Sequence, residues 1–109
     1  MIRNQKENGM ITRKIEAYEE ALKACWELLG NALEANLQNK SYYKIAIRCI
    51  PAEIYGSGQF VEQLKAFQSK ILEIRDQGFS ESYFREITEG MDNLILMVRG
   101  EIGDEINNR

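Results

Sequence analysis

Apolar residues recur at helical spacing in the first part of the chain. From position 11 onward they alternate between steps of four and three residues: Ile11, Ile15, Tyr18, Leu22, Cys25 and Leu29. Steps of this size return to the same side of an α-helix. The pattern predicts a helix over residues 12–37 that begins with Thr12 as its N-cap.

The second half of this helix has a broader apolar face, to which four residues contribute: Trp26, Leu28, Leu33 and Leu37. We expect this half to lie at the centre of the fold, where two neighbouring helices can cover it. Trp26 is predicted to pack in the core or at its rim, with a partner-facing position as the alternative. The narrower half is where we expect a second copy or another partner. The candidate contact residues are Ile11, Ile15, Tyr18, Leu22 and Trp26.

Residues 41–55 fit two patterns. A strand-like alternation runs through Tyr43, Ile45, Ile47 and Cys49. A helical rhythm runs through Tyr43, Ile47, Ile50 and Ile54. Pro51 suits the first turn of a helix, whereas inside a helix it costs about 3 kcal/mol. The segment is therefore predicted to be a helix that is broken or kinked near Ile50, and a strand paired across a dimer is the alternative.

Two further helices are predicted over residues 59–77 and 80–100. The first has a regular apolar stripe formed by Phe60, Leu64, Phe67, Ile71 and Ile74. It should end at Gly78, and Phe79 and Phe84 have the spacing of a hydrophobic staple around a helix start at Ser80. The stripe of the last helix consists of Phe84, Ile87, Met91, Leu94 and Val98.

These elements predict an all-α fold, an antiparallel helical bundle of about four helices in which the first helix is the longest. The chain of 109 residues has the size of one domain. We expect a flexible N-terminal arm at 1–11, a single bundle domain at 12–100 and a flexible C-terminal tail at 101–109. A thin bundle cannot easily cover this much apolar surface, so we expect self-association, most simply as a homodimer.

The amino-acid composition excludes several kinds of catalytic and metal-binding site. The chain contains no histidine, so it supplies no imidazole base and no histidine metal ligand. Its two cysteines, Cys25 and Cys49, form no metal-binding or redox motif and are predicted to be free core thiols. No apolar run approaches the roughly 20 residues of a membrane-spanning helix. We therefore expect a soluble cytoplasmic protein without cofactor, metal or membrane contact.

The net charge of −3 does not favour nucleic acid as a partner. The local exception is a small basic strip that consists of Lys40, Tyr43, Lys44 and Arg48. We predict that this strip is a solvated face with tyrosines packed at its edge. Binding to phosphates or to an acidic protein surface is the alternative.

Carboxylates offer the best case for an enzyme. Glu16-x-x-Glu19-Glu20 lies in the first helix and Glu89-x-x-Asp92 in the last. These strings resemble the ExxE and ExxD helical motifs of all-α nucleotide pyrophosphohydrolases, and the resemblance implies a magnesium site with oxygen ligands. In that family the two motifs lie much closer in the chain. Because the apolar stripe of the last helix turns Glu89 and Asp92 towards solvent, we expect solvated charged faces instead.

The sequence thus predicts a small non-catalytic protein-interaction module, an adaptor, regulator or inhibitor, that acts as a helical dimer. One alternative is a nucleic-acid-associated regulator that uses the basic strip. The other is a carboxylate-metal enzyme similar to the nucleotide pyrophosphohydrolases.

Overall fold

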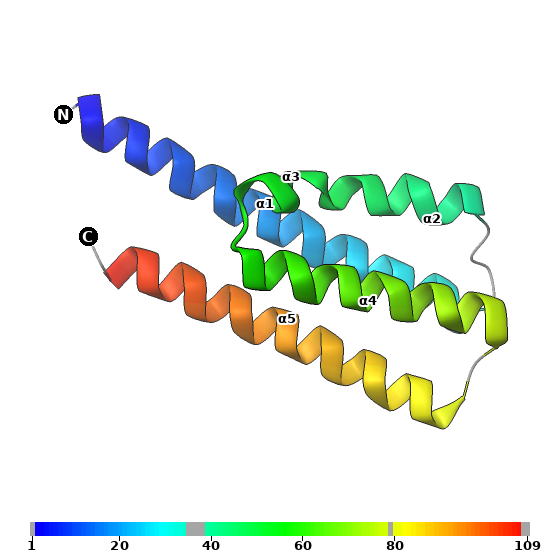
Figure 1. The fold of residues 1–109 in the computed structure, drawn as a ribbon. Coiled ribbons are helices and arrows are strands. Elements are labelled where there is room, and N and C mark those ends of the chain that lie inside the picture. The colour runs from blue at the N-terminus through cyan, green and yellow to red at the C-terminus, as the bar shows by residue number, and fades with distance from the viewer. Residues whose placement is uncertain (1, 35–38, 79, 108–109) are drawn as a thin grey trace.

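Helices account for nearly all of the described chain. The structure is a computed structural model that describes the backbone of residues 2–34, 39–78 and 80–107, and the side chains of residues 12–34, 40–78 and 80–104. Its elements are α1 (Ile2–Leu33), α2 (Asn39–Ala46), the 3-10 turn η1 (Ile47–Cys49), α3 (Ile50–Tyr55), α4 (Gly58–Gln77) and α5 (Glu81–Asn107). Since α2, η1 and α3 form one bent rod, these elements make four helical rods. The predicted all-α bundle is confirmed (Figure 1).

α1 is the longest helix, with 32 residues, as predicted. It begins at Ile2, so Thr12 lies inside the helix and its predicted role as N-cap is wrong. The physical reason is that residues 2–11 contain no proline, and a single glycine costs only about 1 kcal/mol in a helix. α5 also continues beyond residue 100, to Asn107. The flexibility of the arm and of the tail stays a prediction, and the predicted helix end at residue 37 lies outside the described residues.

The bent rod confirms the helical interpretation of residues 41–55 and excludes the strand. The break falls at η1, which ends two residues before Pro51, and Pro51 lies in the first turn of α3. Proline has no N–H to donate to the preceding turn, so a continuous α-helix through this position would lose a hydrogen bond. The result is a rod with two helical segments joined by a tighter turn.

Consecutive rods run in opposite directions (Figure 1). α1 contacts each of the other rods, and α4 packs closely against α5. The bent rod lies on α1 and reaches α4 at Cys49, whose thiol interacts with Gln68. Most of the largest fully buried side chains come from α1, α4 and α5, and they include Tyr18, Leu28, Phe60, Leu64, Ile71, Ile87 and Leu94.

The predicted stripe of α4 is buried along its whole length, and that of α5 is buried apart from Phe84. In α1 the outcome is mixed. Leu28 is fully buried, whereas Trp26 is 64% and Leu33 is 43% exposed, so their predicted place in the core is wrong. They face a side of α1 that no described rod covers. Leu37 lies outside the described residues.

Local signals define the ends of α4 and the start of α5. The Ser57 hydroxyl accepts a hydrogen bond from the Phe60 N–H at 3.1 Å, and Ser80 accepts one from the Tyr83 N–H at 3.2 Å. Gly78 ends α4 with a φ of 89°, a conformation that glycine adopts without steric cost. The predicted staple involves Phe79, which lies outside the described residues. No helix in the described chain combines the length and the apolar character needed to cross a membrane.

Candidate functional site

An apolar groove runs between α1 and α5 and has a volume of about 480 Å³. Its α1 wall is formed by Trp26, Gly30 and Leu33, and its α5 wall by Phe84, Thr88 and Ile95. The buried side chains of Leu29 and Met91 form its floor. Asp92 is the one charged residue among those that line it. We call this feature the α1–α5 groove.

The spacing of these residues explains why the groove is apolar. On α1 the lining residues Trp26, Leu29 and Leu33 follow steps of three and four, and on α5 Phe84, Met91 and Ile95 follow steps of seven and four. Each set therefore occupies one helical face. The inner members pack in the core, while Trp26, Leu33 and Phe84 remain exposed to solvent. The groove is the position in which a further helix would normally pack.

A second apolar surface lies on the bent rod. It consists of Tyr43, Ile47, Ile50 and Ile54, which we call the outer stripe. These side chains are between 44% and 69% exposed. The opposite side of the rod, with Tyr42, Cys49 and Ala52, packs against the bundle. The helical rhythm found in the sequence thus describes a solvent-facing surface rather than the core.

The predicted partner contacts on α1 occupy different environments. Tyr18 is fully buried, so its side chain cannot reach a partner while the bundle is closed. Ile15 and Leu22 are half-buried, and Trp26 is exposed. The side chain of Ile11 lies outside the described residues. Since Ile15, Leu22 and Trp26 are separated by steps of seven and four, they share the face of α1 that leads into the groove.

Tyr18 instead connects three segments of the fold. Its hydroxyl donates to Glu101 Oε1 of α5 at 3.0 Å and accepts from the Ser57 N–H at the start of α4, also at 3.0 Å. Its ring packs on Phe60 with a centroid distance of 4.3 Å. Burial raises the pKa of Tyr18, the hydrogen bond from Ser57 lowers it and the nearby Glu101 raises it further, with a net upward shift.

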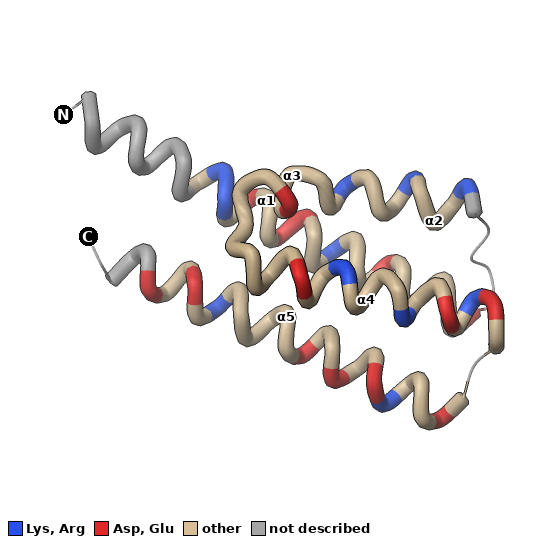
Figure 2. Tube along the Cα trace, viewed as in Figure 1, with Lys and Arg blue, Asp and Glu red and all other residues tan. Residues whose placement is uncertain are grey.

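The fold separates Arg48 from the other residues of the basic strip. Arg48 points back to α1, where its guanidinium forms ion pairs with Glu20 and with Glu27, the latter at 2.5 Å. These two carboxylates raise the pKa of Arg48. Lys40, Tyr43 and Lys44 remain exposed on the rod. The charged residues of α2 are all basic, whereas α1, α4 and α5 contain both basic and acidic residues (Figure 2).

The carboxylates of the alternative metal-enzyme hypothesis do not converge. Among the described residues, no group of three potential ligands of the Asp, Glu and Cys types is close enough to hold a metal ion. Glu89 borders a shallow depression between α4 and α5, whereas Asp92 lines the α1–α5 groove. The two motif residues of α5 therefore point to different sides of the molecule, and Glu20 is engaged by Arg48.

The two cysteines are free, buried and close to each other. A hydrogen bond to Cys49 and burial together raise the pKa of the Cys25 thiol, which keeps its proton at neutral pH. Their interaction joins α1 to η1. Their placement in the core agrees with the sequence prediction of free thiols.

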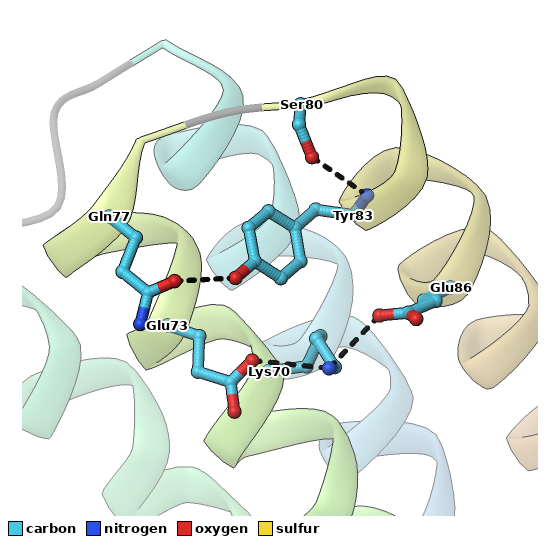
Figure 3. A network of polar contacts seen from close by, with 6 residues as sticks. All are labelled: Lys70, Glu73, Gln77, Ser80, Tyr83 and Glu86. Atoms are coloured by element: carbon cyan, nitrogen blue, oxygen red, sulfur yellow. Dashed lines mark hydrogen bonds and ion pairs between the residues drawn. The ribbon is translucent and has the colours of Figure 1, made fainter.

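Polar contacts around the α4–α5 turn are structural (Figure 3). Lys70 bridges Glu73 on its own helix at 3.1 Å and Glu86 on α5 at 2.9 Å. Tyr83 donates from its hydroxyl to Gln77 Oε1 at 2.6 Å. These contacts hold the two helices together and present no reactive group.

The chain was compared with protein family models, with curated proteins and with solved structures, and none of the three comparisons found a match. The fold itself defines the class of protein, an antiparallel helical bundle. The features that sequence reasoning missed are the groove and the outward direction of the outer stripe. The glycine at position 30, between Trp26 and Leu33, is the one local signal that the helix face there is open.

Proposed function

We propose that this protein is a small non-catalytic interaction module that acts as a helical dimer in the cytoplasm and serves as an adaptor, regulator or inhibitor of another protein. The observation that carries this proposal is the exposure of large apolar side chains in two ordered groups, the α1–α5 groove and the outer stripe. Both groups follow the spacing of a helix face.

Single exposed apolar residues are common on soluble proteins, but contiguous groups usually mark interaction sites. In this chain the groups lie on two different sides of α1, because α5 and the bent rod pack on different sides of that helix (Figure 1). One surface can therefore serve self-association while the other stays available. That arrangement suits a dimer that also binds a partner.

The non-catalytic character rests on the chain's own chemistry. The sequence contains no histidine, and the described polar groups with shifted pKa values, such as Tyr18 and Arg48, bind other parts of the fold. Their hydrogen bonds and ion pairs hold α1 against the bent rod, α4 and α5. They support the architecture rather than a reaction.

The dimer is tested by sedimentation equilibrium at tens of micromolar protein, a concentration at which a stable interface of ordinary size is populated. We expect a mass of twice the 12.6 kDa of the single chain. A strictly monomeric chain with an unchanged helical circular dichroism spectrum contradicts the proposal.

A matched pair of baits tests the interaction module. The wild-type chain and an Ile47→Asp variant, which places a charge on the outer stripe, are used to retain proteins from the native host. We expect a specific partner that binds the wild type and is lost with the variant, while both baits keep the same dimer mass. Equal retention by both baits shows that the outer stripe is not the partner site.

A further inference from the structure

We propose that the dimer forms through the α1–α5 face, so that α1 of each copy packs over α5 of the other. The two-fold axis runs along the α1–α5 groove, parallel to both helices, and Trp26 of each copy enters the groove of its partner. This inference rests on the proposed dimer and assigns its surface and its orientation.

The heights of residues along the bundle follow from the antiparallel contacts of α1 and α5. Tyr18 is level with Glu101, to which it is hydrogen bonded, and Trp26 and Asp92 line the same groove. Each step towards the C-terminus of α1 therefore matches a step towards the N-terminus of α5. By this relation Glu19 is level with Arg99, and Lys23 lies within about one helical turn of Asp92.

These four charged residues line the two outer edges of the α1–α5 face. On α1, Glu19 and Trp26 are seven residues apart and share a face, with Lys23 one turn before Trp26. On α5, Asp92 and Arg99 are also seven residues apart. All four charged side chains are exposed. The α1 edge therefore has a negative and then a positive charge, and the α5 edge has a positive and then a negative charge, at heights that agree within about one helical turn.

A two-fold axis parallel to the helices exchanges the two edges without changing any height. Glu19 of one copy then lies beside Arg99 of the other, and Lys23 lies beside Asp92. The symmetry forms each pair twice, as in any isologous interface. An axis perpendicular to the helices would instead place α1 against α1 and α5 against α5, so that Glu19 would face Lys23 of the other copy rather than Arg99. Charge complementarity thus supports the second copy as occupant, and the parallel axis is the one that pairs Glu19 with Arg99 and Lys23 with Asp92.

The centre of this face has the composition of an interface core. Trp26 is the sole tryptophan of the chain and is 64% exposed at the lip of an apolar groove of about 480 Å³. Next to it, a Cβ added at Gly30 would meet no atom within 4 Å, so the wall is open to an approaching helix. An aromatic anchor surrounded by charged residues is the usual arrangement of a binding hot spot.

The outer stripe is less suited to pairing with its own copy. The exposed charges that flank its first half, Lys40 and Lys44, have the same sign. Two stripes that pair in the same direction therefore place these lysines against each other, whereas the α1–α5 face pairs opposite charges. This difference assigns the groove to the dimer and leaves the stripe for another protein.

The single tryptophan gives a direct test by fluorescence. On dilution from tens of micromolar to the nanomolar range, dissociation should return Trp26 to water and shift its emission to longer wavelength. Trp26→Ala should raise the dimer Kd by about 100-fold or more, because a central tryptophan often carries much of the binding energy. Ile47→Asp is the matched control, since Ile47 is 60% exposed on the other surface. It should leave Kd within about threefold of the wild type.

Charge reversal tests the orientation. Lys23→Glu and Asp92→Lys should each raise Kd by about tenfold or more, because each creates two like-charge contacts in the dimer. The double variant Lys23→Glu/Asp92→Lys should return Kd to within about threefold of the wild type. Such rescue is expected only if Lys23 of one copy meets Asp92 of the other.

The outcomes separate this inference from the proposed dimer. A chain that stays monomeric contradicts both the proposed dimer and the α1–α5 interface. A dimer whose Kd is unchanged by Trp26→Ala, or whose double charge reversal is not rescued, overturns the α1–α5 face while the dimer itself stands. Circular dichroism of each variant is the folding control: if the helical spectrum is unchanged, a lost dimer reports on the interface and not on folding.

Discussion

At the scale of single residues, Tyr18 connects three segments of the fold. One hydroxyl group joins α1 to the start of α4 and to α5, while its ring packs against Phe60 at a tilt. The Ser57 N–H that it accepts belongs to the turn that caps α4. Loss of this hydroxyl therefore leaves a backbone donor and a carboxylate with fewer partners.

Tyr18→Phe should lower the free energy of unfolding by about 1–3 kcal/mol near neutral pH, because it removes two partly buried hydrogen bonds. It should also change the pH dependence. The folded-state pKa of Tyr18 lies above its ordinary value of 10.0, so the unfolded chain loses this proton first. The stabilisation that protonated Tyr18 gives to the fold is therefore complete at lower pH, and it is lost as pH rises above about 10 towards the folded-state pKa.

Urea unfolding between about pH 7 and pH 11 measures both effects. The variant should show a shallower alkaline loss of stability than the wild type, although Tyr42, whose pKa is also raised by burial, keeps part of it. Tyr43→Phe, at an exposed position, is the control and should leave the profile unchanged. An equal alkaline slope in Tyr18→Phe and wild type contradicts the account.

The sequence showed which residues are apolar, but it did not show which of them face the core and which face solvent. Tyr18 and Trp26 lie on the same helix, and each belongs to an apolar pattern, yet one is fully buried and the other is exposed. Their positions on the helix differ by eight residues, or about 80°. The sequence contains this angle, but it does not say on which sides of α1 the other rods pack.

At the scale of elements, the α3–α4 turn depends on the absence of a side chain at position 56. Gly56 has a φ of −80° and a ψ of 164°, an extended conformation that any residue can adopt. The constraint is space: an added Cβ would lie 2.4 Å from the Ala52 carbonyl oxygen and 2.8 Å from Cε1 of Tyr18. The backbone of α3 cannot yield without moving the turn.

Gly56→Ala should therefore destabilise the fold by about 1–3 kcal/mol, the usual cost of overpacking. Gly58→Ala is the matched control two residues later, since a Cβ there meets no atom within 4 Å. It should be neutral or stabilising by up to about 1 kcal/mol, because alanine is the better helix former. Thermal unfolding of the pair measures the contrast, and equal melting temperatures argue against the close contact.

Elements with local signals were predicted well. α4 has a serine cap, a continuous apolar stripe and a terminal glycine, and all three agree on its position. The bent rod was harder because both of its faces contain apolar residues. Its helical rhythm identified Ile47 and Ile54 as members of one face, but periodicity alone cannot distinguish a core face from an exposed one.

At the scale of the whole molecule, the bundle is long and thin, with principal extents of 53 × 25 × 18 Å. Such a shape has long side faces relative to its interior, which is why four rods leave both a groove and a stripe uncovered. The surplus of apolar surface could be anticipated from the sequence. The groove could not be, because it depends on how two helices from opposite ends of the chain pack.

The proposed interface combines an apolar centre with solvent-exposed ion pairs. The salt dependence of the dimer Kd distinguishes the contributions of these two parts. Raising the salt concentration from about 0.05 M to 1 M shortens the screening length to about 3 Å and should raise the dimer Kd by about tenfold. Lys23→Gln/Asp92→Asn should reduce this dependence, since fewer charges remain to be screened. Fluorescence of Trp26 across a dilution series measures both, and an identical salt response in the two proteins contradicts the assigned pairs.

The outer stripe lies on the bent rod, away from the α1–α5 groove, and this placement determines what a dimer can present. A two-fold axis parallel to the helices directs the two stripes to opposite sides but keeps their chain direction the same. A partner with two binding segments, or two partners attached to one surface, would then be held with a higher effective concentration than one stripe provides. The dimer would act through avidity, and its dissociation would weaken partner binding without any change in the stripe itself.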